Sequence, residues 1–258
     1  MSSPDIHSTA VVLPGAVLAG TVVIGPYAIV EDGAVLGDGA VVGAHAVVHG
    51  SATLRPGVRI GVHAVIGGDP QDLKFSPQMP TRVEIGERTV IREFATVHRS
   101  TCETPTRVGR NCLLMGGIHV GHDCRIGDRV VLAQTSTLGG HVTVDDDAII
   151  GGMTGVHQHV RIGRLAMVGA MAKVTRDVLP YMLVDGAPAV HWWVNEVGLN
   201  RHGVPPAERV ALREALRALR RGGDLDGSAG GAVRDLLAFV AGPSPRGLAG
   251  FGRRGATT

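Results

Sequence analysis

The fold is decided by residues 108–174, which read VGRNCLLMGGIHVGHDCRIGDRVVLAQTSTLGGHVTVDDDAIIGGMTGVHQHVRIGRLAMVGAMAKV. Every sixth residue of this stretch, from the first to the last, is Leu, Ile or Val. The same spacing governs residues 6–66 and recurs briefly over 85–97. Because six is an even number, the repeated residue always faces the same side of a strand. Short parallel strands stacked in this register would bury one continuous column of aliphatic side chains.

Glycine often follows the repeated aliphatic residue, as in Ile24-Gly25 and Ile126-Gly127, and it lets the backbone bend between short strands. This pattern resembles that of the hexapeptide-repeat proteins. The resemblance implies that three hexads form one triangular coil of about 18 residues, and that the coil winds left-handed. We therefore expect a mostly β protein, with a left-handed parallel β-helix over residues 1–186.

Two interruptions of the repeat indicate loops. Residues 67–84 break the period and are predicted to form a loop insertion that projects from the coil, and residues 98–107 a smaller one. After the repeat ends, residues 187–258 are predicted to form a small α-helical C-terminal domain. Apolar residues at helical spacing indicate helices over 205–221 and 233–240, separated by a Gly-rich joint and followed by a flexible tail.

The composition excludes several classes of protein. Hydrophobic residues make up 44% of the chain and aromatic residues 3%, so the core must consist of small aliphatic side chains. The 25 Lys and Arg nearly balance the 23 Asp and Glu, which gives no general attraction to nucleic acid. Neither a signal peptide nor a membrane-spanning segment is indicated. Cys102, Cys112 and Cys124 match neither a zinc pattern nor a disulfide framework, so we expect a cytoplasmic protein.

Four of the 12 histidines are predicted to gather at one corner of the coil. With about 18 residues in a coil, His119, His122, His141 and His157 fall along one edge, and neighbouring coils lie about 4.8 Å apart. Histidines on exposed turns are common, so surface residues are one interpretation. Metal ligation and general-base catalysis are the other two.

The spacing of these histidines bears on the metal interpretation. A trimeric β-helix carbonic anhydrase binds zinc through a His-x4-His spacing, whereas this chain has His119-x2-His122 and His157-x-His159. The sequence therefore favours general-base catalysis, with His122 removing a proton from a hydroxyl.

Three stretches resemble one family within the hexapeptide-repeat proteins. They are IGGDPQDLKFSPQMPTRVEIG, LLMGGIHVGHDCRIGDRVVLA and LGGHVTVDDDAIIGGMTGVHQ, which contain QDLK, HxxHDC and GGMTxVHQ in that order. They are similar to the UDP-N-acetylglucosamine O-acyltransferases that begin lipid A synthesis, and the similarity covers roughly residues 6–203. The resemblance implies direct transfer of a fatty, 3-hydroxy acyl group from acyl carrier protein to the sugar 3-hydroxyl, with no cofactor and no metal.

The resemblance also implies roles for individual residues. His122 is similar to the general base, Asp123 would orient its imidazole, and the backbone N–H of Gly140 would stabilise the oxyanion. The implied residues for binding of the sugar-nucleotide substrate are Gln71, Asp72, Lys74, His119, His141, His157, Gln158, Asn195, Arg201 and His202. The resemblance further implies a homotrimer with active sites between the chains.

Small residues one coil apart suggest a groove for the acyl chain. Gly116, Gln134, Gly152 and Ala170 are predicted to stack on one face of the coil. Ala170 stands where some relatives have glycine. With Met167 and Met171 beside it, it is predicted to shorten the accepted acyl chain.

One segment departs from the family's pattern and leaves the acceptor open. Residues 195–203 follow N-x-x-G-L-x-R-R-G, except that His202 replaces the second arginine, and arginine binds phosphate with a permanent forked charge. The adjacent Trp192 and Trp193 are also unusual. They would serve either as anchors in the core of the helical domain or as contacts for a ligand. Alternatives are a 3-amino sugar nucleotide or a specialised-metabolite intermediate as acceptor, a non-catalytic trimeric scaffold, or a carbonic anhydrase-like enzyme. The basic helix predicted over 205–221 would face the acidic carrier protein.

Overall fold

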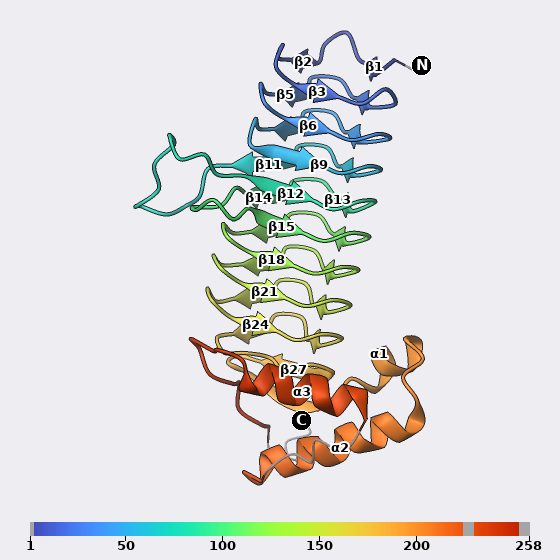
Figure 1. The fold of residues 1–258 in the computed structure, drawn as a ribbon, viewed down its shortest axis with the longest axis vertical. Coiled ribbons are helices and arrows are strands. Elements are labelled where there is room, and N and C mark those ends of the chain that lie inside the picture. Colours follow the sequence, from blue (N-terminus) through green and yellow to red (C-terminus); the bar gives the residue numbers. More distant parts are fainter. Residues whose placement is uncertain (1–2, 224–229, 253–258) are drawn as a thin grey trace.

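Residues 3–223 and 230–252 are described by the computed structural model, and they form a parallel β-helix with helices at its C-terminal end (Figure 1). Successive strands belong to three different sheets, so each coil contributes one strand to each face. In the described part of the chain, sheet A has 11 strands, sheet B has 9 and sheet C has 8. The predicted fold class, a coil of hexapeptide repeats followed by helices, is confirmed.

The strands of the coil are mostly two residues long. Sheet A contains β1 (Asp5–Ile6), β4 (Val23–Ile24), β7 (Val41–Val42), β10 (Arg59–Ile60), β13 (Val90–Ile91), β16 (Leu113–Leu114), β19 (Val131–Leu132), β22 (Ile149–Ile150), β25 (Met167–Val168), β27 (Met182–Gly186) and β28 (Ala189–Val194). Sheet B contains β2 (Val11–Val12), β5 (Ile29–Val30), β8 (Val47–Val48), β11 (Val65–Gly68), β14 (Thr96–His98), β17 (His119–Val120), β20 (Thr137–Leu138), β23 (Gly155–Val156) and β26 (Lys173–Val174). Sheet C contains β3 (Val17–Leu18), β6 (Val35–Leu36), β9 (Ala52–Leu54), β12 (Val83–Ile85), β15 (Thr106–Val108), β18 (Arg125–Ile126), β21 (Thr143–Val144) and β24 (Arg161–Ile162).

The repeated aliphatic residue fills the centre of the coil, as the period predicts. Val120 pairs with Leu138 and Leu138 with Val156, so residues one coil apart lie above one another. Small residues such as Ala28 and Ala46 are also fully buried and form the second inward position of their hexads. Two inward positions of this size leave no room for aromatic side chains, which explains their scarcity.

The corner between sheets B and C holds residues in the left-handed backbone conformation. Asp123, His141 and His159 occupy equivalent turns of successive coils, with φ of 59°, 61° and 63°. Asp and His tolerate this conformation better than most residues do. The turn geometry therefore brings a column of titratable side chains to one edge of the coil.

Both loop insertions leave the coil at this same corner. The longer loop, residues 69–82, joins β11 of sheet B to β12 of sheet C, and the shorter loop, residues 99–105, joins β14 to β15. Figure 1 shows the longer loop projecting sideways from the coil. Arg99 holds the two loops together, with its Nη2 2.7 Å from a carboxylate oxygen of Asp69. The two predicted interruptions thus correspond to loops above the histidine corner.

The C-terminal unit contains α1 (Glu196–Arg201), α2 (Pro206–Arg220) and α3 (Gly231–Ala241). Helices α2 and α3 correspond to the two predicted helices, whereas the sequence analysis did not anticipate α1. The proposed division between residues 186 and 187 falls at the end of β27, directly before the turn to β28, but β28 still belongs to sheet A. In the Gly-rich joint, 224–229 lie outside the described residues.

The two tryptophans lie near the helices. Trp193 packs against the hydrophobic cluster of the C-terminal unit, which includes the fully buried Leu212 and Leu216. The indole N–H of Trp192 donates to the backbone of Asp185. Trp193 is therefore packed as a core anchor.

The segment after α3 returns to the end of the coil. Residues 242–252 pack back against it, and Ala249 is buried there, whereas 253–258 of the predicted tail lie outside the described residues. Among the described helices, none has the length and apolar character needed to cross a membrane.

Candidate active site

The site is built around a hydrogen-bonded pair, His122 and Asp123, which follows β17. The imidazole Nδ1 of His122 lies 2.7 Å from Oδ2 of Asp123. An ionised carboxylate can only accept, so Nδ1 carries the proton and Nε2 keeps its lone pair. The neighbouring Asp123 therefore fixes the tautomer that a general base needs.

The shorter loop surrounds Asp123. The backbone N–H of Thr101 donates to Oδ1 over 3.0 Å and its hydroxyl donates to Oδ2 over 2.7 Å. The carboxylate side chain is only 6% exposed. Burial opposes ionisation, but the hydrogen bonds from His122 and then Thr101 outweigh it and lower the pKa of Asp123. Asp123 is therefore held in its charged form.

Further histidines surround His122. The ring of His141 lies edge-on to it at 5.2 Å and stacks on His159 at 4.5 Å. On the other side, His98 lies edge-on to His119 at 4.7 Å. Burial, followed by repulsion from His119 and His122, lowers the pKa of His98 to about 4, and burial also lowers the pKa of His119. The lowered pKa values favour the neutral form of both rings; Nδ1 of His119 lies 2.8 Å from the hydroxyl of Thr96, whereas Nδ1 of His98 is buried without a described partner.

Gly140 lies directly beside the imidazole of His122. A Cβ at this position would come within 2.5 Å of Cε1 and 2.6 Å of Nε2 of the ring. The neighbouring backbone N–H groups of Gly139 and His141 donate within the coil, but no described backbone acceptor takes the N–H of Gly140. The position thus places an available backbone donor directly beside the imidazole of His122.

A pocket of about 480 Å³ opens over these residues. Of the predicted site residues it is lined by Gln71, His119, His122, Gly140, His157 and Gln158. Residues that the sequence analysis missed also line it, namely His98, Thr137, Gly155, Lys173 and Thr175. His98 could have been found by aligning the repeat across the second interruption, since the residue before it, Val97, pairs with Val120.

Two residues of the longer loop lie outside the lining of this pocket. Asp72 accepts a hydrogen bond from the backbone N–H of Lys74 over 3.0 Å, which shapes the loop near Gln71. The loop thus brings Gln71 to the pocket and leaves Asp72 and Lys74 beside it.

Asn195, Arg201 and His202 lie at a different corner, between sheets C and A. Asn195 caps α1 by accepting from Gly198 N–H, and its amide donates to the backbone of Leu165. Nε2 of His202 lies 3.4 Å from a carboxylate oxygen of Asp147. Within one chain, these three residues are therefore not brought to the histidine pocket.

The residues predicted for the acyl groove lie at or beside the third corner. Gly152 and Ala170 follow strands of sheet A at the turn towards sheet B, Met171 is 70% exposed there, and Met167 is in β25 of sheet A. This corner borders sheet B on the edge opposite to His122. An acyl chain would have to cross the face of sheet B to reach it.

The cysteines and the metal interpretation can be judged from the same geometry. Burial raises the pKa of Cys112 to about 11 and that of Cys124 to about 12, so neither is a ready nucleophile. His122, Asp123 and His141 offer ligand atoms within 4.8 Å of one another, which could hold a metal ion. His122 and Asp123 form a hydrogen bond with each other over 2.7 Å, which favours the general-base interpretation.

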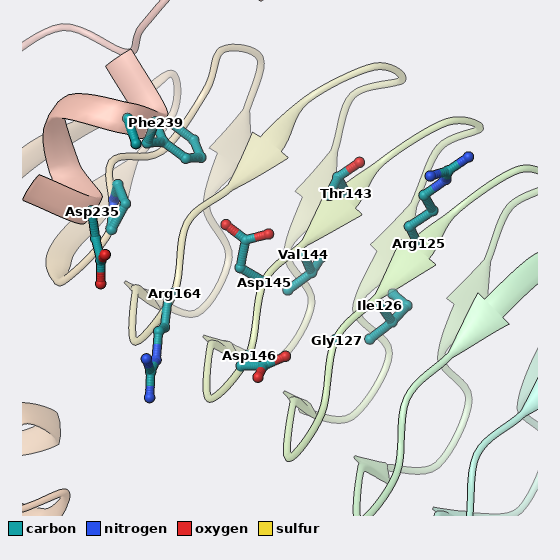
Figure 2. A pocket seen from close by; sticks show the side chains of 12 residues that line it. Arg125, Ile126, Gly127, Thr143, Val144, Asp145, Asp146, Arg164, Asp235 and Phe239 are labelled. Atoms are coloured by element: carbon teal, nitrogen blue, oxygen red, sulfur yellow. The ribbon is translucent and has the colours of Figure 1, made fainter. Parts of the chain in front are cut away.

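A second cavity, of about 520 Å³, lies between sheet C and α3. Figure 2 shows Arg125 and Asp145 on the strand side and Asp235 and Phe239 on the helix. Burial, and then the neighbouring Asp146, raise the pKa of Asp145. No histidine or cysteine is among the residues that line this cavity, so it lacks the base that the histidine pocket has.

A coil of hexapeptide repeats that carries a half-buried histidine–aspartate pair fits the class of hexapeptide acyltransferases. Two family models match the chain, one described as bacterial transferase hexapeptide (six repeats) over residues 105–140, and one as UDP-N-acetylglucosamine O-acyltransferase, domain 2, over residues 177–249.

Relatives that match most of the chain show to which family it belongs. The acyl-[acyl-carrier-protein]–UDP-N-acetylglucosamine O-acyltransferase of Paraburkholderia xenovorans is 44% identical over 251 residues, which is 91% of this chain and 95% of the relative. The chain belongs to this family and is an acyltransferase. Among solved structures, the UDP-N-acetylglucosamine acyltransferase from Campylobacter jejuni matches with a TM-score of 0.89 at 32% identity, over 96% of this chain and 100% of that one. The Francisella novicida enzyme also matches with a TM-score of 0.89 at 32% identity, over 95% and 93% of the chains.

Proposed function

We propose that this enzyme transfers a 3-hydroxyacyl group from acyl carrier protein to the 3-hydroxyl of UDP-N-acetylglucosamine, as the first step of lipid A biosynthesis. The observation that carries the proposal is the hydrogen-bonded pair of His122 and Asp123 beside Gly140. A relative that matches 91% of the chain is named as an acyl-[acyl-carrier-protein]–UDP-N-acetylglucosamine O-acyltransferase. The cytoplasmic location expected from the sequence stays a prediction.

The reaction needs one base and one oxyanion donor. Nε2 of His122 takes the proton of the sugar 3-hydroxyl, and the oxygen attacks the thioester carbonyl. The N–H of Gly140 donates to the oxyanion that forms. When the tetrahedral intermediate collapses, the new ester forms, the carbon–sulfur bond breaks, and the departing thiolate takes the proton from His122. The charge of Asp123 stabilises the imidazolium between these two steps.

The faces of the coil support a homotrimer. The outward residues of sheet C include Glu84, Arg107 and Arg125, which suit solvent. The outward residues are aliphatic along most of sheet A (Val23, Val41, Val90, Leu113, Val131, Ile149) and in the first coils of sheet B (Val11, Ile29, Val47, Val65). Two different apolar faces favour a head-to-tail contact that closes into a ring, with sheet A of one copy on sheet B of the next.

This arrangement accounts for the residues at the distant corner. The histidine pocket lies at the outer edge of sheet B, and Asn195, Arg201 and His202 lie at the outer edge of sheet A. When sheet A of one copy packs on sheet B of the next, these two edges meet. We assign the three residues to the acceptor site of the neighbouring copy, where Arg201 would hold a phosphate.

The carrier protein is the proposed donor partner. Arg217 of α2 and Arg221, directly after this helix, are exposed, whereas Arg213 is neutralised by Glu196 at 2.7 Å. An exposed basic surface of this kind attracts the acidic surface of an acyl carrier protein.

A product assay tests the proposal. The purified protein is incubated with acyl carrier thioesters of several chain lengths and with UDP-N-acetylglucosamine or its 3-amino analogue, and the products are weighed by mass spectrometry. We expect an acylated UDP-N-acetylglucosamine, and a loss of at least about 100-fold in kcat for His122→Ala. The control, His7→Ala, changes an exposed histidine of the first coil. Product with the 3-amino sugar alone would instead favour the alternative acceptor that His202 suggests, and no product with either would refute the proposal.

Removal of metal ions distinguishes the general-base interpretation of His122 from the metal-ligand interpretation. Because His122 is proposed to act as a free imidazole, dialysis against a chelator should leave kcat within about twofold. A loss of activity that added zinc restores would assign His122, Asp123 and His141 to a metal ion instead.

A further inference from the structure

The segment after α3 is fixed by backbone hydrogen bonds to the end of the coil. Asp177 N–H donates to the carbonyl of Gly247, and Ala249 N–H donates to the carbonyl of Asp177, both over 2.9 Å. A bridge pairs Asp177 with Leu248. These contacts determine where the preceding residue, Arg246, lies.

Arg246 reaches the rim of the histidine pocket. Its guanidinium contacts Nδ1 of His157 and lies 2.8 Å from Nε2 of the same ring, and His157 lines the pocket. A guanidinium has five N–H donors, whereas a neutral imidazole has a single acceptor nitrogen. The Nε of Arg246 is buried and has no described hydrogen-bond partner. The protein therefore leaves most of this hydrogen-bonding capacity unused.

Two more cations lie nearby, one in the pocket that His157 lines and one beside the residue that follows Arg246. Lys173 is in the pocket wall, and a guanidinium nitrogen of Arg176 lies 3.6 Å from where a Cβ of Gly247 would be. No described carboxylate lies within 4.0 Å of the charged groups of Lys173, Arg176 or Arg246, whereas the nearby Arg161 is paired with Asp177 at 2.7 Å. These three cations therefore have no described anionic partner, and a bound anion would be attracted to them.

We propose that Arg246, with Lys173 and Arg176, forms a binding site for a phosphate group of a substrate, contributed by the C-terminal segment to the pocket of its own chain. The inference rests on the proposed function, in which both substrates carry phosphate: the acceptor as a nucleotide diphosphate, and the donor in the phosphopantetheine arm. The forked donors of arginine match phosphate oxygens. His157 holds the guanidinium at the rim until the phosphate arrives.

The test compares Arg246→Gln with Arg246→Lys and with a matched control, Arg234→Gln, which removes an exposed arginine of α3. We measure KM for each substrate, inhibition by UDP and by pantetheine 4′-phosphate, and the melting temperature. Arg246→Gln should raise one KM by about tenfold or more, with a smaller change in kcat. Arg246→Lys should recover part of the loss, and Arg234→Gln should match the wild type.

The two sources of phosphate give different results. A higher KM for the nucleotide together with weaker inhibition by UDP assigns the site to the acceptor. A higher KM for the acylated carrier together with weaker inhibition by pantetheine 4′-phosphate assigns it to the donor. If neither KM moves by more than twofold and the melting temperature is unchanged, the proposal is overturned.

A direct titration keeps this test separate from that of the proposed function. Inorganic pyrophosphate is titrated into the wild type and Arg246→Gln while the imidazole resonances of His157 are followed by NMR. We expect binding that Arg246→Gln weakens by about tenfold. Equal affinities would overturn the phosphate site even if the enzyme proved to use a different acceptor.

Discussion

At the scale of single residues, the site depends on a glycine, Gly140, as much as on the histidine beside it. Gly140 is needed because the ring of His122 occupies the space that any Cβ would fill. The periodicity places both residues at the same corner of neighbouring coils. The overlap depends on the rotation of the imidazole, which Asp123 fixes through its hydrogen bond.

The substitution Gly140→Ala should therefore displace the catalytic ring. The added Cβ would lie 2.5 Å from Cε1 of His122, so the imidazole must rotate away from Asp123 or the turn must shift. We expect kcat to fall by about 100-fold or more, as for loss of an oxyanion donor. The control is Gly231→Ala, where an added Cβ meets nothing within 4 Å. A kcat within threefold of the wild type would show that His122 is not positioned as described.

At the scale of elements, the coil could be predicted almost completely, because each hexad repeats the same local constraint. The position of His141 next to His122 follows from counting residues along the repeat. The contacts of Thr101 and Arg246 could not be predicted, since neither belongs to a hexad. Their positions depend on how a loop and a C-terminal segment fold back, which no period encodes.

The shorter loop, residues 99–105, is expected to act on catalysis through Asp123. Thr101→Val removes the hydroxyl that donates to Oδ2 and keeps the backbone N–H that donates to Oδ1. With one donor fewer, the carboxylate orients His122 less firmly and its pKa rises. We expect kcat to fall by about tenfold at unchanged KM, since a hydrogen bond to a charged group contributes about 1.5–3 kcal/mol. Thr101→Ser keeps the hydroxyl and should retain kcat, and equal losses in both variants would contradict this role.

The corner between sheets A and B tests the predicted acyl groove. Ala170→Gly removes a methyl group at a turn that borders sheet B, and it should let the enzyme accept a chain longer by one or two carbons. Product lengths are compared by mass spectrometry over a series of acyl carrier thioesters. As a control, Ala211→Gly makes the same change on α2, away from sheet B. Identical length profiles for the wild type and Ala170→Gly would remove Ala170 from the groove.

At the scale of the whole molecule, a buried neutral histidine connects the end of the coil to the C-terminal segment. His191 is fully buried where β28 meets the C-terminal segment, and its Nε2 accepts from Leu179 N–H over 2.9 Å. Its Nδ1 lies 3.1 Å from the carbonyl of Ala249, so the neutral ring is both donor and acceptor. Burial lowers the pKa of His191 to about 4, as it does for His98 in the coil.

These two histidines predict a loss of stability in mild acid. In the unfolded chain each has its ordinary pKa of 6.5, and in the folded chain about 4. Above pH 6.5 both states are neutral and stability is at its full value. As the pH falls towards 4, the unfolded chain takes up protons that the folded chain cannot, so stability declines. Asp123 has a lowered pKa and contributes only below its ordinary value of 3.8, outside this window.

The decline is measurable by thermal unfolding at fixed protein concentration. At pH 5 each histidine should cost roughly 2 kcal/mol, and together they should lower the melting temperature by roughly 10 °C relative to pH 7.5. His98→Gln removes one of these titrations and should reduce the slope of melting temperature against pH. The control, His7→Gln, removes an exposed histidine and should leave the slope unchanged. A melting temperature that stays flat from pH 7.5 to 5 in the wild type would mean that His98 and His191 accept protons in the folded protein.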